Sequence, residues 1–220
     1  LGLRAERAAR YVDWAAAARA RAHDASGGSV GYCHLSEMED GGYAQLVRAL
    51  LAEAERPCLI VDVRANAGGS ISELAMRLLL APPLLWHAPR HGGRSAYPEL
   101  AKAHIAIMVD EFTSSDGELL AHACRAARGA AVIGARTWGG VLSMEDVEIV
   151  SGPGGTLSLP AAQLLAADGT AALENVGVVP DVPLAPVPPS RPGAATGSAD
   201  PHLDAAIAHL MRQMGLAGAS

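Results

Sequence analysis

The chain has 220 residues, enough to bury one core of ordinary size, and small aliphatic side chains must build that core because only 4% of the residues are aromatic. The net charge is −6 and Lys and Arg do not cluster, which argues against a nucleic acid or an anionic membrane as partner. No apolar run reaches the roughly 20 residues of a membrane helix, and residues 1–21 carry charges throughout, unlike a secretory signal. We therefore expect a soluble protein. Because the chain does not begin with Met, we also expect it to be part of a longer one.

The predicted elements alternate between helix and strand. Helix formers with apolar residues at three- and four-residue spacing predict an amphipathic helix over residues 4–23. The elements that follow are strands at 29–35, 57–64, 104–109, 131–134, 147–150 and 156–159, and helices at 43–55, 71–80, after Ser115 and at 201–214. Strands rich in Ile and Val indicate an α/β fold, in which helices cover a mostly parallel sheet and a smaller part is rich in β-structure.

Two of these strands end in unusual turns. Residues 57–64 run into Asn66-Ala67-Gly68-Gly69-Ser70, whose glycines permit a close approach of backbone. This turn has neither the lysine of a P-loop nor the GxGxxG spacing, so we do not expect a nucleotide site. The strand at 104–109 runs into Thr113-Ser114-Ser115-Asp116-Gly117-Glu118 and a helix. A strand, a special turn and a helix therefore occur twice.

Ser115 stands where that helix begins. Free backbone N–H groups and the positive end of the helix dipole favour a negative oxygen there, which suits a nucleophile beside an oxyanion hole. The spacing from Ser115 to Glu118 is also that of a capping box, in which the serine only accepts an amide hydrogen bond. The local sequence favours the cap.

The remaining reactive residue types point to structural roles. Three cysteines, far apart and in or beside apolar runs, fit buried free thiols in a reducing compartment: Cys33, Cys58 and Cys124. The eight histidines include no HExxH motif, so we expect no metal and no cofactor. We expect His34, His104 and His122 to be structural and His202 and His209 to lie on a solvated helix face. No histidine is an evident partner for Ser115.

Four segments in order resemble the catalytic core of the tricorn proteases, which belong with the tail-specific serine peptidases. They are residues 60–69 (IVDVRANAGG), 113–117 (TSSDG), 134–140 (GARTWGG) and 173–181 (LENVGVVPD), and the resemblance spans about residues 25–183. It implies a crotonase-like fold, with a core of repeated β-β-α units and a sheet flanked by helices. It also implies a hydrolase that acts on peptides.

The resemblance implies roles for individual residues. Ser115 matches the nucleophile, and the oxyanion donors would be the N–H of Asp116 and one from the Gly68-Gly69 turn, with Gly69 favoured. Glu174 matches the carboxylate that helps to hold the catalytic histidine through a second serine. The alternative for Glu174 is an exposed loop acid.

Neighbouring positions are expected to shape the site. Arg64 and Asn66 would form the turn, and Gly139 and Gly140 would let backbone pass close to the site. His87 stands where the family places an acidic residue for a basic substrate side chain. If His87 binds substrate, the family's preference for a basic substrate side chain is not expected to hold for this chain.

At Gly140 the sequence differs a second time from the pattern of the related proteases. Tail-specific proteases carry a lysine base about 25 residues after the serine, where this chain has Gly140, and Lys102, its one lysine, precedes the strand at 104–109. The base must then be a histidine which, in tricorn proteases, lies in an upstream region. We expect an N-terminal helix at 1–24, a catalytic core at 25–184, a Pro- and Ala-rich linker at 185–199, and a C-terminal helix and tail at 200–220.

These observations predict a cytoplasmic serine endopeptidase that cleaves oligopeptides through a Ser115 acyl-enzyme. The isolated chain is expected to be nearly inert. Its partners would be peptide substrates, upstream domains of the same protein and, by resemblance, further copies in a hexamer. The alternative is a non-catalytic binding or assembly module of the same fold, since a fold does not determine a function.

Overall fold

A five-stranded parallel sheet forms the centre of the computed structural model, which describes residues 2–91, 95–97, 102–149, 154–166, 168–170, 172–186 and 199–215. Its strands lie side by side in chain order: β1 (Val30–His34), β2 (Cys58–Asp62), β5 (His104–Val109), β6 (Ala131–Gly134) and β9 (Val182–Pro183). All neighbouring pairs are parallel. The predicted α/β fold with a mostly parallel sheet is therefore confirmed.

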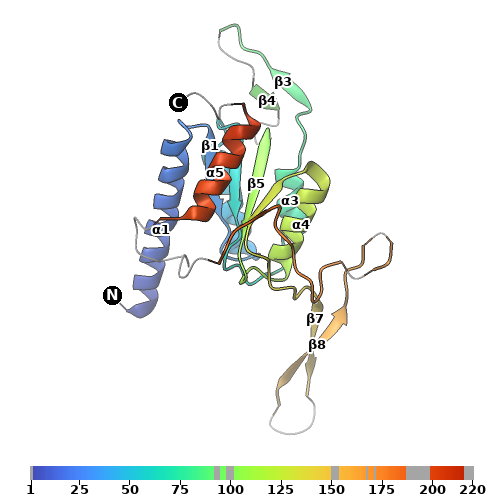
Figure 1. Ribbon diagram of the computed structural model, residues 1–220. Coiled ribbons are helices and arrows are strands. Elements are labelled where there is room, and N and C mark those ends of the chain that lie inside the picture. Colours follow the sequence, from blue (N-terminus) through green and yellow to red (C-terminus); the bar gives the residue numbers. More distant parts are fainter. Residues whose placement is uncertain are drawn as a thin grey trace.

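Helices cover both faces of this sheet (Figure 1). The connecting helices α2 (Asp40–Ala52), α3 (Ser72–Leu79) and α4 (Asp116–Arg128) pack on one face, and the terminal helices α1 (Leu3–Ala25) and α5 (Pro201–Gln213) pack on the other. The strand side chains alternate between the two cores, as the period of a strand requires. In β5, for example, Ile107 belongs to the first core and Met108 to the second.

Two antiparallel hairpins extend from opposite ends of this body (Figure 1). One consists of β3 (Leu85–His87) and β4 (Ser95–Tyr97), in a region for which the sequence predicted no strand. The other consists of β7 (Ser143–Glu148) and β8 (Thr156–Ala162) and is the smaller β-rich part. The predicted strand at 147–150 begins four residues too late, and its last residue lies outside the described residues.

Several buried groups join the terminal helices to the sheet. Arg64 is buried, pairs with Asp62 at 2.6 Å and with Asp200 at 2.9 Å, and lies 5.8 Å from the Trp14 ring. Asp200 also caps α5, because its side chain accepts a hydrogen bond from the Leu203 N–H. One polar network therefore connects β2 with both α1 and α5.

Individual residues confirm or correct the sequence-based expectations. Cys33, Cys58 and Cys124 are buried and free, as predicted. His202 is wrongly predicted to be solvated: it is buried, and its Nε2 lies 3.0 Å from the Ala185 carbonyl oxygen. The helix shows why, because its buried face also contains Leu203, Ala206, Ile207 and Leu210. Most of the predicted 185–199 linker lies outside the described residues, as does the tail beyond residue 215.

The carboxyl ends of β2, β5 and β6 meet at one edge of the sheet, where the turns at 63–71, 110–115 and 135–142 begin. Ligand sites of open α/β sheets are characteristically formed at this edge. No helix in the described ranges is both long enough and apolar enough to cross a lipid bilayer.

Candidate active site

Ser115 lies in a strained backbone conformation between β5 and α4. Its φ is 52° and its ψ is −123°, a region that non-glycine residues rarely adopt and that costs about 1–3 kcal/mol. The preceding residue is fixed, because the Ser114 N–H donates to the Asn66 carbonyl oxygen at 2.9 Å. A strained serine held by its neighbours at the carboxyl edge of a sheet is typical of a functional position.

The capping pair predicted from the sequence is present on its glutamate side. The Ser115 N–H donates to Glu118 Oε2 at 2.9 Å. The Glu118 N–H donates to the Ser115 carbonyl oxygen at 2.9 Å, and although the two residues have the capping-box arrangement, the Ser115 hydroxyl itself makes no side-chain cap hydrogen bond. The Ser115 side chain therefore faces the Glu118 N–H as in a capping box, while that N–H bonds to the Ser115 carbonyl oxygen.

Gly68 lies directly against Ser115. A Cβ atom at position 68 would stand 2.5 Å from Ser115 Cβ, 3.1 Å from Ser115 Oγ and 3.2 Å from the Asp116 backbone nitrogen. Gly68 also has a φ of 96°, so both its conformation and its surroundings require glycine. The structure thus brings the Gly68-Gly69 turn and the serine together.

Two backbone N–H groups in the turns around Ser115 remain available. The Gly68 N–H donates to Asn66 Oδ1 at 2.8 Å, whereas in the described part of the chain no hydrogen bond takes up the N–H of Gly69 or that of Asp116. The Asp116 side chain is buried, and its Oδ2 accepts the Ser72 N–H at 2.7 Å, at the first turn of α3. Free backbone donors in the turns around a serine are what an oxyanion hole would require.

The side chains of Asn66 and Asp110 fix the turns at 63–71 and 110–115 through hydrogen bonds. The buried Asn66 amide donates to the Leu35 carbonyl oxygen at 2.8 Å, and Asp110 Oδ1 accepts the Ala65 N–H at 2.9 Å and the Thr113 hydroxyl at 3.1 Å. Burial raises the pKa of Asp110. These contacts agree with the prediction that Asn66 shapes the turn.

Glu118 makes contacts that the capping pattern did not predict. Its side chain is fully buried, and besides Ser115 it accepts the N–H groups of Gly139 at 2.8 Å and Gly140 at 3.1 Å, and the hydroxyl of Thr137. The same oxygen, Oε2, accepts from Ser115 and from Gly140. One carboxylate therefore joins the serine to the 137–140 loop.

Glu174 lies beyond that loop. It is half-buried, and its Oε2 accepts the Val141 N–H at 2.7 Å. The alternative of an exposed loop acid is therefore wrong. No hydrogen bond within the described residues uses its second oxygen, Oε1, which leaves that atom available to a partner.

The glycine pair at 139 and 140 has two separate functions in the structure. A Cβ at Gly139 would stand 2.9 Å from the Gly177 nitrogen, so this position allows two backbone segments to meet. A Cβ at Gly140 would stand 2.3 Å from Cζ3 of the Trp138 ring, which lies across this residue. A lysine at position 140 would require the indole to move.

None of the eight histidines, all within the described residues, makes a hydrogen bond with Ser115 or Glu174. His34 is structural, as expected: Nε2 donates to the Arg64 carbonyl oxygen at 3.0 Å, Nδ1 accepts the Tyr11 hydroxyl at 2.9 Å, and burial lowers its pKa. His87 is exposed on the β3–β4 hairpin, at the opposite end of the body from the β7–β8 hairpin (Figure 1). The structure does not bring His87 together with Ser115 in one chain.

Neither Lys102 nor the acidic residues supply a base or a metal site next to Ser115 in the described part of the chain. Lys102 is buried, donates to the carbonyl oxygens of Glu53, Ala54 and Arg56 beyond the end of α2, and has its pKa lowered by burial. It precedes β5, whereas Ser115 follows it. In the ranges that the structure describes, His, Cys, Asp and Glu side chains do not gather in threes as a metal ion would require.

Comparisons with known proteins identify relatives of this chain. A model of peptidase family S41 matches residues 29–184. The chain is 41% identical over 179 residues to tricorn protease homolog 2 of Streptomyces coelicolor, covering 80% of the chain and 15% of that protein. It is 31% identical over 210 residues to the tricorn protease of Thermoplasma acidophilum, covering 95% of the chain and 19% of that protein.

A solved structure is also similar. The crystal structure of the tricorn protease superimposes with a TM-score of 0.79 at 30% identity, covering 92% of this chain and 19% of that one. The chain spans less than a fifth of the length of these three relatives.

Proposed function

The chain belongs to peptidase family S41, and we propose on that basis that Ser115 is the nucleophile of a serine endopeptidase that cleaves oligopeptides. The observation that supports the proposal is the close approach of Gly68 to Ser115 and Asp116, in turns where the N–H groups of Gly69 and Asp116 make no hydrogen bond within the described residues. The likeness to tricorn proteases supports the substrate class. It also supports a crotonase-like core of repeated β-β-α units.

The reaction requires a general base. The hydroxyl of Ser115 is a weak nucleophile until a base removes its proton as Oγ attacks the carbonyl carbon of the scissile bond. The negative charge that develops on the carbonyl oxygen would be met by the N–H groups of Gly69 and Asp116, each worth roughly 3 kcal/mol in such a site. The amine then leaves, and water hydrolyses the acyl-enzyme.

We infer that the base is an imidazole from a region outside this chain. Within the described residues no hydrogen bond joins a histidine to Ser115, and Gly140 stands where the tail-specific proteases carry their lysine. Glu174, with Oε2 anchored on Val141 and Oε1 available, is suited to receive the serine of a serine-histidine pair. The chain would then be the C-terminal catalytic domain of a longer protein.

The test is hydrolysis of fluorogenic peptides, with and without the upstream region of the full-length protein. We expect the chain alone to be nearly inert, and Ser115 to react with a fluorophosphonate only when the upstream region is present. The Ser115→Ala variant should lose both reactions, whereas Ser158→Ala on the exposed β8 strand should retain them. Robust hydrolysis that survives Ser115→Ala would reject the proposal.

The resemblance also supports a cytoplasmic protein that assembles into a homo-oligomer, a hexamer in the family. Light scattering of the full-length protein tests the assembly. A role for His87 in substrate binding stays a prediction. His87 lies on the β3–β4 hairpin, which extends from the opposite end of the body to the β7–β8 hairpin (Figure 1).

A further inference from the structure

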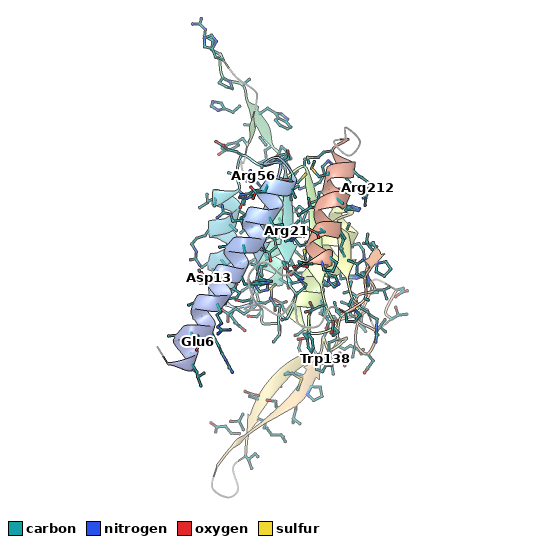
Figure 2. The ribbon with its side chains drawn as sticks, turned by 60° about the vertical axis from the view of Figure 1, so that its left-hand side comes forward. Glu6, Asp13, Arg21, Arg56, Trp138 and Arg212 are labelled. Carbon is teal, nitrogen blue, oxygen red and sulfur yellow. The ribbon has the colours of Figure 1, made fainter. Side chains whose placement is uncertain are left out.

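We propose that Trp138, laid across Gly140 beside Ser115, forms an apolar binding site for an aliphatic or aromatic side chain of the peptide substrate. This inference rests on the proposed function and assigns a role to the Trp-Gly-Gly motif. Trp138 lies where the β7–β8 hairpin leaves the body (Figure 2). Its side chain is 67% exposed, although the other tryptophan of the body, Trp14, is only 7% exposed.

The indole is close to the reacting serine. Glu118 Oε2 accepts from the Ser115 N–H at 2.9 Å and from the Gly140 N–H at 3.1 Å, so these two amides approach the same atom. The six-membered ring of the indole covers Gly140, since a Cβ there would stand 2.3 Å from Cζ3 and 2.5 Å from Cε3. The ring therefore belongs to the loop that shares Glu118 Oε2 with Ser115.

The loop that carries Trp138 is fixed on both sides. The residues before and after it, Thr137 and Gly139, both donate to Glu118, and the Trp138 N–H donates to the Thr113 carbonyl oxygen at 3.0 Å. An aromatic side chain on a rigid loop loses little conformational freedom when it binds a ligand. Large exposed aromatic residues of this kind are common anchors of binding surfaces.

The surroundings determine the chemical class of the ligand. Phe112, on the turn that receives the Trp138 N–H, is 46% exposed, and Val176, whose nitrogen would stand 3.1 Å from a Cβ at Gly139, is 51% exposed. These two neighbours are apolar, which favours Leu or Phe side chains over Ala, whereas the exposed Arg136, whose Nη1 donates to the Val176 carbonyl oxygen at 2.6 Å, is the charged group beside them. Burial of such a side chain on the indole removes apolar area from water.

The experiment compares peptides that differ only in an Ala, Leu, Phe or Glu at one position, scanned through the positions on both sides of the scissile bond. The assay uses the full-length protein, for which hydrolysis is expected. We expect one peptide position at which kcat/KM for Leu or Phe exceeds that for Ala by about 10-fold or more. Trp138→Ala should abolish this preference, Trp138→Phe should largely retain it, and Trp86→Ala should leave it intact. Trp86 is the matched control, because it is 52% exposed but lies on the other hairpin.

Other outcomes would overturn the inference. A uniform fall of kcat/KM for all peptides in Trp138→Ala would show that Trp138 positions the loop or contacts another part of the protein. Absence of any apolar preference in the wild type would also reject it. If no Ser115-dependent hydrolysis is found, the proposed function fails separately, and calorimetric titration of this chain with the Phe and Ala peptides still decides whether Trp138 provides an apolar preference.

Discussion

Glu118 is the residue with the largest difference between sequence pattern and structure. The capping-box pattern identifies only its bond with Ser115, whereas the folded chain adds Thr137, Gly139 and Gly140 as donors. A buried carboxylate needs several donors, because an unpaired charge in the interior is costly. No spacing rule could predict these donors, since they lie about twenty residues away and meet Glu118 only after β6 is added to the sheet.

Glu118→Gln tests whether this carboxylate positions the serine. The amide of Gln keeps one oxygen, and its nitrogen cannot accept hydrogen bonds. In one orientation the N–H groups of Ser115 and Gly140 lose their acceptor, and in the other that of Gly139 does, so at least one N–H group of this site is left unpaired. Buried donors left unpaired cost about 1–3 kcal/mol, and we expect fluorophosphonate labelling of Ser115 in the full-length protein to slow by about 10- to 100-fold.

The matched control is Glu73→Gln on α3, where an exposed carboxylate pairs with Arg77. This variant should be labelled at the rate of the wild type. Equal labelling rates for Glu118→Gln and the wild type would refute the positioning role. The urea midpoint of each variant shows whether slower labelling merely reflects unfolding.

Elements with a strong pattern were predictable and isolated short ones were not. The buried strands β2 and β5 and the helix α4, with Gly129 in a left-handed conformation at its end, follow from apolar runs and turn residues. The hairpin β3–β4 has only three residues in each strand and an exposed surface, and β9 has two residues that include a proline. Neither carries a periodic signal, because their pairing depends on contacts between distant segments.

Helix α5 offers a test at the same scale. Asp200 accepts the Leu203 N–H at 3.1 Å as a helix cap and pairs with the buried Arg64 at 2.9 Å. Asp200→Ala removes the cap and leaves Arg64 with one carboxylate fewer. We therefore expect the free energy of unfolding in urea to fall by about 2–4 kcal/mol.

Asp204→Ala is the control on the same helix. Asp204 pairs with Arg21 at 2.7 Å, but both side chains are more than 40% exposed, and exposed pairs contribute about 0–1 kcal/mol. Equal losses in the two variants would mean that the buried network does not hold α5 on the sheet.

The whole molecule depends on buried polar groups that hold its layers together near the candidate site. His34 is the clearest example: Tyr11 and Trp14 of α1 surround its ring, and its Nε2 supports the Arg64 carbonyl, just before the turn that ends in Gly68 and Gly69. Its tautomer is determined by these two bonds, since the carbonyl can only accept. Protonation of the ring would place a charge between α1 and the sheet.

The stability of the domain should therefore decrease in mild acid. Burial lowers the pKa of His34, despite the opposing charges of Asp62 and Asp110, and burial also lowers the pKa of His122 and of His209. In the unfolded chain these rings bind protons below about pH 6.5, before the folded chain does. The unfolded state then gains stability, by up to about 1.4 kcal/mol per pH unit for the buried His34 and by less for His122 and His209, which are partly exposed and screened by solvent.

Urea unfolding at intervals between pH 7.5 and 5 measures this dependence. His34→Gln, whose amide can still donate to the Arg64 carbonyl oxygen, removes one of the three rings and should flatten the slope below pH 6.5 without abolishing it. His87→Gln should leave the slope unchanged, because that ring is exposed in the folded and the unfolded chain alike. A slope in His34→Gln as steep as that of the wild type would show that His34 takes up its proton equally in both states, and that the buried contact between α1 and the turn is not sensitive to pH.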